Sequence, residues 1–458
     1  MKRNITLKQL LVFMSIFVLC IPIINAQENS AIREYLQYYD SIQYFRYYDQ
    51  RGINVFETTK EGSPTYQGFR VRFGAGFTQQ YQALSHENKG ALNYQTTNRL
   101  YPLQDGFMTA QANLNMDVQL ADGIRLNLTT YLSSRHHNEA WVKGGYIQFD
   151  KLPFKGKFWD DLMKITTIKI GHMEVNYGDA HFRRPDGGQT LYSPFMEGLI
   201  MDDFATEIGG EVYLQKNGLF GMIGMTNGMI KGHVDSVYET VADDNTKRAP
   251  SIYFKGGFDR KLSEKLRLRL SASYYTNSSS GGSGLTLFGG DRTGSNYQNV
   301  MEKVPLGTPN PASTAVAFSG RLNPGFSKKV NALMLNAFVK YAGFEVFGTY
   351  ENAKGRTKNE TSTRTMDQFS IDGVYRFGSK ENVFIGAKYN TVSGRLAGTA
   401  FTKDISVNRT AFAAGWFLTR NILLKGEYVI QNYVDFPTSD YRATGKFNGV
   451  VIEAIVGF

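Results

Sequence analysis

The chain has 458 residues, with 51 lysines and arginines against 41 acidic residues, so its formal net charge is +10. A basic chain can meet nucleic acid, anionic lipid or anionic solutes, and the export described next favours the last two. The single cysteine, Cys20, lies in a segment that we expect to be removed. Disulfides and cysteine-based metal or nucleophile sites are therefore excluded from the mature chain.

Residues 1–26 predict a signal peptide. Lys2, Arg3 and Lys8 are basic, and the apolar run 10–24 is too short for a stable anchor and leads to a small-residue cleavage site. Loss of these three basic residues lowers the net charge from +10 to +7. No small residue directly precedes the cysteine, so we expect no lipidation.

The rest of the sequence offers no apolar stretch of about 18 residues, so no transmembrane helix is expected. A closed β-barrel is the remaining way to cross a bilayer. The 27 tyrosines, 32 phenylalanines and 47 glycines favour one, because barrels use aromatic residues at their girdles and glycines at their corners.

Residues 27–65 precede the repeated pattern and predict an amino-terminal arm. Ile32, Leu36 and Tyr39 follow one another at helical spacing. Two interpretations stay open: a periplasmic helix or arm packed against the barrel rim, or a plug in the lumen whose tyrosines stack on sugars or line a constriction.

From about residue 69 onwards, apolar and polar side chains alternate in runs of roughly ten residues. Phe69, Val71 and Phe73, for example, share one face, while Arg70 and Arg72 share the other. This period of two predicts strands with two unlike faces. We expect strands near 69–82, 106–120, 123–133, 141–150, 164–174, 204–215, 219–227, 249–258, 265–276, 330–340, 343–351, 365–377, 382–391, 408–418, 420–431 and 446–458.

The connections distinguish a membrane barrel from a soluble β-sandwich, which shows the same alternation. Short turns such as 121–123, 216–218 and 341–343 alternate with long polar loops such as 83–105 and 277–329. Outer-membrane barrels have this arrangement, with turns in the periplasm and loops outside. The chain also closes on an alternating strand that ends at an aromatic residue, Phe458, which resembles the assembly signal of such barrels.

The predicted fold is therefore an all-β, antiparallel, up-and-down transmembrane barrel of about 16 strands over residues 66–458. Because the first and last strands must pair, we expect an even strand count and both ends in the periplasm. The predicted location is the outer membrane of a Gram-negative bacterium.

If lipid covers the apolar faces, the opposite faces line the lumen and make its wall partly basic. We expect a mixed wall with a basic excess, which favours a transverse field. The alternative is that these charges pair across strands and only hold the barrel round. The predicted wall residues are Arg70, Arg72, Arg125, Glu207, Glu211, Lys265, Arg267, Arg269, Lys340 and Lys388.

The most distinctive connection is 175–203, the third outer loop, because general porins fold this loop into the lumen to set the pore size. The predicted constriction consists of Asp179, His181, Arg183, Arg184 and Asp186, whose arginines attract anions. Two alternatives are a loop that covers the mouth and one that stabilises a neighbour. A calcium site formed by Asp179, Asp186, Asp202 and Asp203 is a further hypothesis without regular motif spacing.

Two stretches carry a family resemblance: 168–184, from Ile168-Lys169-Ile170-Gly171-His172 to Arg183-Arg184, and 201–211, which begins Met201-Asp202-Asp203. They resemble the outer-membrane porin-like barrels of Bacteroidetes and, more loosely, phosphate-selective porins. The resemblance covers about a tenth of the chain and implies a passive diffusion channel without identifying the solute.

We expect no enzyme and no cofactor. An outer-membrane lipase or protease needs a nucleophile and a base together at a rim. His136, His137, His172, His181 and the pair Asp202-Asp203 supply candidate groups, but no Gly-x-Ser-x-Gly or His-Glu-x-x-His motif accompanies them. No metal site is expected among the functional residues, and no nucleic-acid motif is present.

The leading hypothesis is a porin-like channel for passive diffusion of small hydrophilic solutes, with a preference for anions. The alternative is a plugged barrel that acts as a structural or adaptor component of a secretion, motility or uptake assembly. Expected partners are outer-membrane lipid, the barrel-assembly machinery, small hydrophilic or anionic solutes, and two further copies in a homotrimer.

Overall fold

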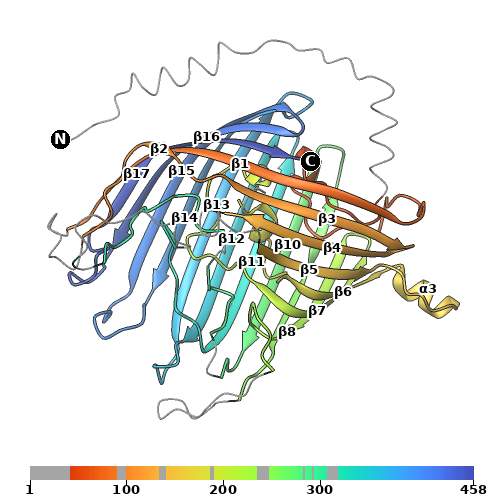
Figure 1. Cartoon of the computed structure of the whole chain (residues 1–458), viewed down its shortest axis with the longest axis horizontal. Helices are drawn as coiled ribbons and strands as arrows, with labels where there is room; N and C mark the ends of the chain where they lie inside the picture. The colour runs from red at the N-terminus through yellow and green to blue at the C-terminus, as the bar shows by residue number, and fades with distance from the viewer. Residues whose placement is uncertain are drawn as a thin grey trace. The chain divides into compact units, whose positions relative to one another are not determined.

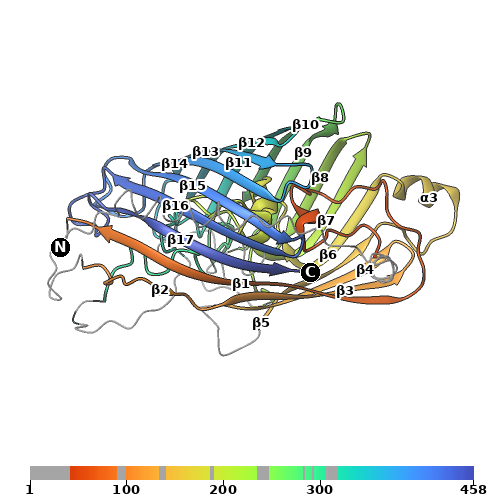
Figure 2. The ribbon, with the colours of Figure 1, turned by 90° about the horizontal axis from the view of Figure 1, so that it is seen from above.

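The structure, a computed structural model, describes residues 42–89, 99–133, 141–185, 190–234, 247–281, 284–290, 293–305, 307 and 318–458. All of its labelled strands belong to one antiparallel sheet that closes on itself (Figures 1 and 2). In chain order they are β1 Arg70–Glu87, β2 Gly106–Phe107, β3 Gln111–Ala121, β4 Ile124–Leu132, β5 Trp141–Phe149, β6 Thr166–Glu174, β7 Thr206–Lys216, β8 Leu219–Thr226, β9 Ser251–Lys261, β10 Leu266–Asn277, β11 Lys329–Tyr341, β12 Phe344–Arg356, β13 Arg364–Phe377, β14 Val383–Gly394, β15 Ile405–Thr419, β16 Ile422–Val434 and β17 Lys446–Gly457.

The two-residue β2 and its neighbour β3 are segments of one barrel strand. Both pair with β1, where Tyr81 faces Phe107 and Thr78 faces Gln111. The pairing therefore slips by one residue between the two segments, as at a β-bulge. Counted this way, the barrel has 16 strands, as the sequence predicted.

The first and last strands close the barrel. β1 pairs with β17 from Gly76 opposite Gly457 to Glu87 opposite Lys446. Beyond this ladder, Ala75 and Phe458 exchange two backbone hydrogen bonds of 3.0 Å each. Closure leaves no free sheet edge, which the hydrocarbon core of a membrane requires.

Side chains alternate between an apolar outer face and a polar inner face of the barrel wall. On β13, Phe369, Ile371, Tyr375 and Phe377 are 42 to 45% exposed on the outside, whereas Asp372 points inward and is buried. The span from Phe369 to Phe377 covers roughly 27 Å of strand, or about 20 Å along the membrane normal at a tilt of about 45°. Such a band suits the hydrocarbon thickness of an outer membrane. No helix in the described residues is long and apolar enough to cross a membrane.

Short turns connect the strands at one end of the barrel. Between β7 and β8 the turn consists of Asn217 and Gly218, with φ angles of 52° and 76°. A two-residue hairpin needs positive φ at both positions, which asparagine and glycine tolerate. At the opposite end the connections are longer. In the described ranges the predicted alternation of short and long connections holds except at the turn-end connection 150–165 between β5 and β6, which is long.

The described part of the amino-terminal arm, 42–65, contributes contacts inside the wall near the turn end. Gln50 donates a backbone hydrogen bond of 3.0 Å to the carbonyl of Arg420, in the turn between β15 and β16. Phe56 is 2% exposed and packs edge-on against Phe338 of β11 at a centroid distance of 5.6 Å. The helical spacing around Ile32 lies outside the described residues, as does the predicted signal peptide.

We predict that Phe458 contributes to barrel closure through its side chain as well as its backbone. The ring is 51% exposed on the outer face, where it meets lipid. Phe458→Ser should lower the folded fraction in the outer membrane severalfold, because a polar residue replaces an apolar one at the closing seam. Heat-modifiable migration in SDS gels measures folding, and Phe458→Tyr is the matched control that keeps the ring. Equal folding of the serine variant and the wild type would contradict this role.

Candidate functional site

The connection between β6 and β7 is here called the inner loop (175–205), and its described residues, 175–185 and 190–205, are deeply buried inside the barrel. It contains the 3₁₀ turns η2 (Ala180–Arg183) and η3 (Thr190–Tyr192). Met196, Ile200 and Met201 along it are each 0% exposed. Side chains of the wall satisfy its backbone: the N–H of Ile200, for example, donates to the Asn390 side chain at 2.7 Å. A loop can be buried only when its backbone groups find such partners.

Asp179 of the inner loop forms part of a buried charge cluster together with Glu57 of the amino-terminal arm. Arg269 on β10 lies 2.7 Å from both carboxylates, and Lys255 on β9 lies 2.7 Å from Asp179 and 2.9 Å from Glu57. Ser271 donates a further hydrogen bond of 2.6 Å to Asp179. The two wall cations thus neutralise one carboxylate from each inner segment.

Burial on its own raises the pKa of the Glu57 carboxyl, but the charges of Lys255 and Arg269 outweigh it and lower this pKa to about 2. The same two cations, acting against burial, hold the pKa of the Asp179 carboxyl below its usual range. Both carboxyls are therefore ionised at neutral pH, which keeps the cluster electrically balanced.

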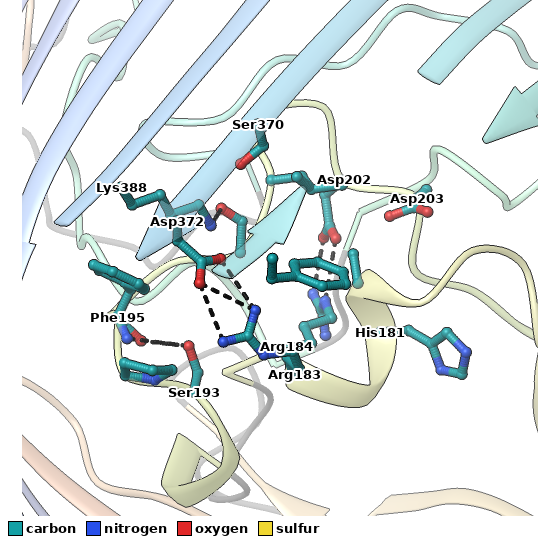
Figure 3. A pocket seen from close by; sticks show the side chains of 15 residues that line it. His181, Arg183, Arg184, Ser193, Phe195, Asp202, Asp203, Ser370, Asp372 and Lys388 are labelled. Atoms are coloured by element: carbon teal, nitrogen blue, oxygen red, sulfur yellow. Dashed lines mark hydrogen bonds and ion pairs between the residues drawn. The ribbon is translucent and has the colours of Figure 1, made fainter. Parts of the chain in front are cut away.

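The two arginines of the predicted constriction also form ion pairs (Figure 3). Arg183 approaches both oxygens of Asp372 on β13 at 3.1 Å, and its guanidinium lies 4.6 Å from the ring centre of Phe347. Arg184 pairs with Asp202 within the loop at 2.8 Å, and Arg321 pairs with the same carboxylate at 2.8 Å. Carboxylates compensate both of these arginine charges, so the two side chains hold the loop in place and do not form an uncompensated cationic ring.

Of the two remaining residues of the predicted constriction, the structure describes His181 but not Asp186. His181 lies between the Glu174 carboxylate, at 2.8 Å, and the Asn176 side chain, at 2.9 Å. Asp186 lies outside the described residues. No group of three or more potential metal ligands gathers in the described ranges, so the calcium hypothesis gains no geometric support there. The constriction role itself stays a prediction.

Sequence reasoning missed that two inward-facing lysines hold the inner loop by its backbone. Lys425 on β16 donates to the carbonyls of Thr190, Ser193 and Phe195 at 3.0 to 3.2 Å and pairs with Glu453 of β17 at 3.1 Å. Lys388, assigned to the wall, instead donates to the carbonyl of Gly198 at 2.7 Å. The inward parity of Lys425 was visible, but nothing in the sequence indicated that its partner is a loop carbonyl.

Most predicted wall residues face the lumen, as their parity requires. Arg125, Glu207, Glu211, Arg269 and Lys388 are buried, while Arg70, Arg72, Arg267 and Lys340 are half-buried. Lys265 is the exception: it is exposed in the turn between β9 and β10. β10 begins one residue later than predicted, so Lys265 belongs to the turn, and its place in the lumen wall stays a prediction.

A cavity of about 240 Å³, here called the first cavity, separates the inner segments from strands β3 to β6. Its cationic lining consists of Arg46, Arg125, Lys143 and Arg184, against the acidic Asp117 and Glu174. It is also lined by the aromatic side chains of Phe45, Tyr48, Tyr146, Tyr192 and Phe204 and by the amides of Asn113, Asn115 and Asn127. Without the histidines, its lining carries an excess of two positive charges.

Arg46 connects the amino-terminal arm to the inner loop at this cavity. Its Nη2 donates to the carbonyls of Gly52 at 2.9 Å and of Phe182 at 2.7 Å, and its guanidinium lies 4.0 Å from the ring centre of Tyr192. Burial lowers the pKa of Arg46, although an arginine remains charged at any physiological pH. Among the described contacts, the Arg46 guanidinium contacts two carbonyl oxygens and an aromatic ring, and it binds no carboxylate directly.

A second cavity, of about 360 Å³, opens at the turn end between the arm and strands β9 to β13. Gln50, Ile53 and Asn54 of the arm contribute to its lining. Its charged lining residues are Lys261, Lys265, Arg267, Lys340 and Arg376 against Glu264 and Glu381, an excess of three positive charges.

Comparisons with known proteins support the fold. No protein-family model and no curated protein matches the sequence. The anion-selective porin from Comamonas acidovorans superposes with a TM-score of 0.50 at 9% identity, over 85% of this chain and 100% of that chain. A loop L8 deletion mutant of OmpT from Vibrio cholerae gives 0.48 at 10% identity, over 86% and 100%. The outer membrane channel DcaP of Acinetobacter baumannii gives 0.48 at 10% identity, over 85% and 98%.

At these identities the likeness concerns architecture alone. This chain is a closed, 16-strand, antiparallel, up-and-down barrel, and its fold matches outer-membrane proteins of Gram-negative bacteria. The predicted fold class is thereby confirmed. The resemblance to Bacteroidetes barrels stays a prediction.

Replacing either of the adjacent inner-loop aspartates, Asp202 and Asp203, by asparagine should change the stability of the protein in opposite directions. Asp202 pairs with Arg184 and Arg321, whereas the buried Oδ2 of Asp203 has no hydrogen-bond partner among the described residues. Burial and the neighbouring Asp202 raise the pKa of the Asp203 carboxyl to about 8. Asp202→Asn should therefore destabilise the protein by about 3 kcal/mol at pH 7, because it leaves two buried cations undercompensated.

Asp203→Asn should instead stabilise the protein, and more strongly as the pH rises. Above a pH of about 4 the unfolded state loses the Asp203 proton while the folded state keeps it until about pH 8, so wild-type stability falls across this window. Near pH 3 both states hold the proton and the variant should gain little. Urea unfolding in detergent at pH 3, 5 and 8 measures the difference, and a pH-independent effect of Asp203→Asn would contradict this assignment.

Proposed function

We propose that this protein is a porin-like outer-membrane channel through which small hydrophilic solutes diffuse passively, with a preference for anions. The observation that carries the proposal is the charge of the two lumen cavities, whose linings hold an excess of two and three positive charges. Arg184 in the first cavity pairs with Asp202, and Arg267 and Arg376 in the second pair with Asp259 and Glu345. With these pairs set aside, each lining still keeps an excess of one positive charge. A cationic lining raises the local concentration of anions and lowers that of cations.

The size of the passage follows from what occupies the lumen. A barrel of about 16 strands is wide enough for an aqueous passage. Here the inner loop and the described part of the arm take up much of that width, and the first cavity is about 240 Å³. A volume of this order suits small ions and metabolites and supports a narrow, weakly selective channel rather than a wide general pore.

Planar-bilayer recordings under a salt gradient test the channel and its selectivity. The wild-type protein should conduct ions, and its reversal potential should have the sign that anion preference gives. Lys143→Gln removes one charge from the first cavity and should lower the anion-to-cation permeability ratio about tenfold, since a unit charge about 6 Å away in water shifts the energies of an anion and a cation by about 0.7 kcal/mol each, in opposite directions.

Lys354→Gln is the matched control for this experiment. Lys354 is exposed on the outer face of β12, so the same change of charge should leave the permeability ratio unaltered. Absence of conductance would overturn the channel, and a cation preference in the wild type would overturn the anion selectivity alone.

A second candidate function is a plugged barrel that serves as a structural or adaptor component of an outer-membrane assembly. The observation that favours it is the deep burial of the inner loop, with Met196, Ile200 and Met201 fully enclosed. Affinity purification from intact membranes, followed by conductance measurements on the purified complex, separates the two functions. A stoichiometric partner and a sealed lumen would favour the adaptor, whereas conductance by the isolated barrel would favour the channel.

A further inference from the structure

The connection between β5 and β6 differs from the other turn-end connections because it carries a helix. This helix, α3 (Lys157–Met163), projects from the turn end of the barrel (Figures 1 and 2). Its Met163 is 3% exposed, whereas Phe158 is 68% and Trp159 is 37% exposed, and Phe154 just before the helix is 55% exposed. Met163 thus anchors the last residue of α3, whereas the residues at and just before its start present large apolar rings to the outside.

The exposed rings form a single group, here called the α3 aromatic cluster (Phe154, Phe158 and Trp159). Trp159 is central to it, with ring-centre distances of 5.3 Å to Phe154 and 5.1 Å to Phe158. Three clustered aromatic rings are costly to expose to water, and such patches usually mark a surface that meets a membrane or another molecule.

The position of the cluster relates it to the lipid-facing surface of the barrel. At the turn end of the later strands, exposed aromatic residues form a girdle: Tyr341, Phe344, Tyr375, Phe377 and Phe458. At the same end of β3, β7 and β8, the large exposed residues are leucines instead: Leu120, Leu214 and Leu219. Aromatic residues mark the interface between hydrocarbon and headgroups. The α3 aromatic cluster supplies them in the sector where these strands carry leucine.

The charges around the cluster point to the kind of surface it meets. Residues 151–164 contain Lys151, Lys155, Lys157 and Lys164 against Asp160 and Asp161, and Lys151 also pairs with Asp122 in the turn between β3 and β4, which leaves an excess of one positive charge. Asp161 is shared by Lys157 and Lys164, the latter at 2.6 Å. A basic segment with apolar rings on its exposed side suits a membrane surface that contains anionic phospholipid.

We propose that the α3 aromatic cluster is an interfacial anchor that sits among the headgroups of the periplasmic leaflet and prefers anionic phospholipid. The rings enter the boundary between headgroups and acyl chains, while the lysines meet phosphate groups. This inference depends on the barrel's membrane location and is independent of whether the lumen conducts.

Tryptophan fluorescence tests the proposal, because the chain has only three tryptophans. Trp141→Phe with Trp416→Phe leaves Trp159 as the sole tryptophan in the full-length barrel, reconstituted in phosphatidylcholine vesicles with phosphatidylglycerol. Brominated phospholipid should quench Trp159 strongly, and aqueous acrylamide should quench it weakly. Brominated phosphatidylglycerol should quench about twofold more than brominated phosphatidylcholine at equal content, because the local lysines enrich the anionic lipid.

The matched control moves the fluorophore to a loop exposed to water. Thr402→Trp, combined with phenylalanine at the three native tryptophan positions, places it in the connection between β14 and β15, where acrylamide should dominate. All variants must show heat-modifiable migration, which establishes that they are folded. Quenching of Trp159 by acrylamide as strong as in the control would overturn the anchor. Protection from both quenchers would also overturn it, since the ring would then be covered by protein. Equal quenching by the two brominated lipids would overturn the anionic preference.

Discussion

The structure depends on one constraint: each strand meets hydrocarbon on one face and a polar interior on the other. In hydrocarbon, an unpaired backbone group costs several kcal/mol, so the sheet must close and leave no edge. The hydrogen bonds between Ala75 and Phe458 and the ladder between β1 and β17 accomplish this. Because apolar side chains occupy the outside, charged side chains are confined to the interior, where water alone is too scarce to solvate them all.

The interior resolves this by pairing its charges, alongside a buried apolar cluster that includes Met196, Ile200 and Met201. Arg269, Lys255 and Lys425 on the wall are almost fully buried, and each meets a carboxylate of another segment. Buried ion pairs add little net stability over apolar packing, yet removing one partner is costly. Such pairs therefore act as geometric restraints. They fix where the inner loop lies and, by exclusion, where the cavities remain.

The sequence predicted the fold well because the period-two alternation and the lengths of the connections are local properties. It placed the strand ends less well on the loop side. The predicted strand 343–351 ends at Glu351, whereas β12 continues to Arg356. Beyond the apolar band the outer face also meets water, as at Lys354, so the alternation of polarity ends before the strand does.

The site was predicted less completely than the fold, for a physical reason. Parity placed Arg269 on the inner face, and composition singled out Arg183 and Arg184. Which of these pair depends on contacts across the lumen between residues far apart in the chain, such as Arg183 with Asp372, and no local pattern encodes them. Consequently, the constriction was expected from the charges of the loop, whereas the excess charge lies on the cavity linings.

The cluster around Arg269 and Lys255 has a further consequence for how the interior comes apart. Glu57 and Asp179 belong to different segments but share the same two cations. If either segment withdrew alone, the other would be left with an excess of positive charge in a poorly solvated space. The arm and the loop are therefore energetically linked and should leave the lumen together, as one cooperative unit, before the surrounding wall unfolds.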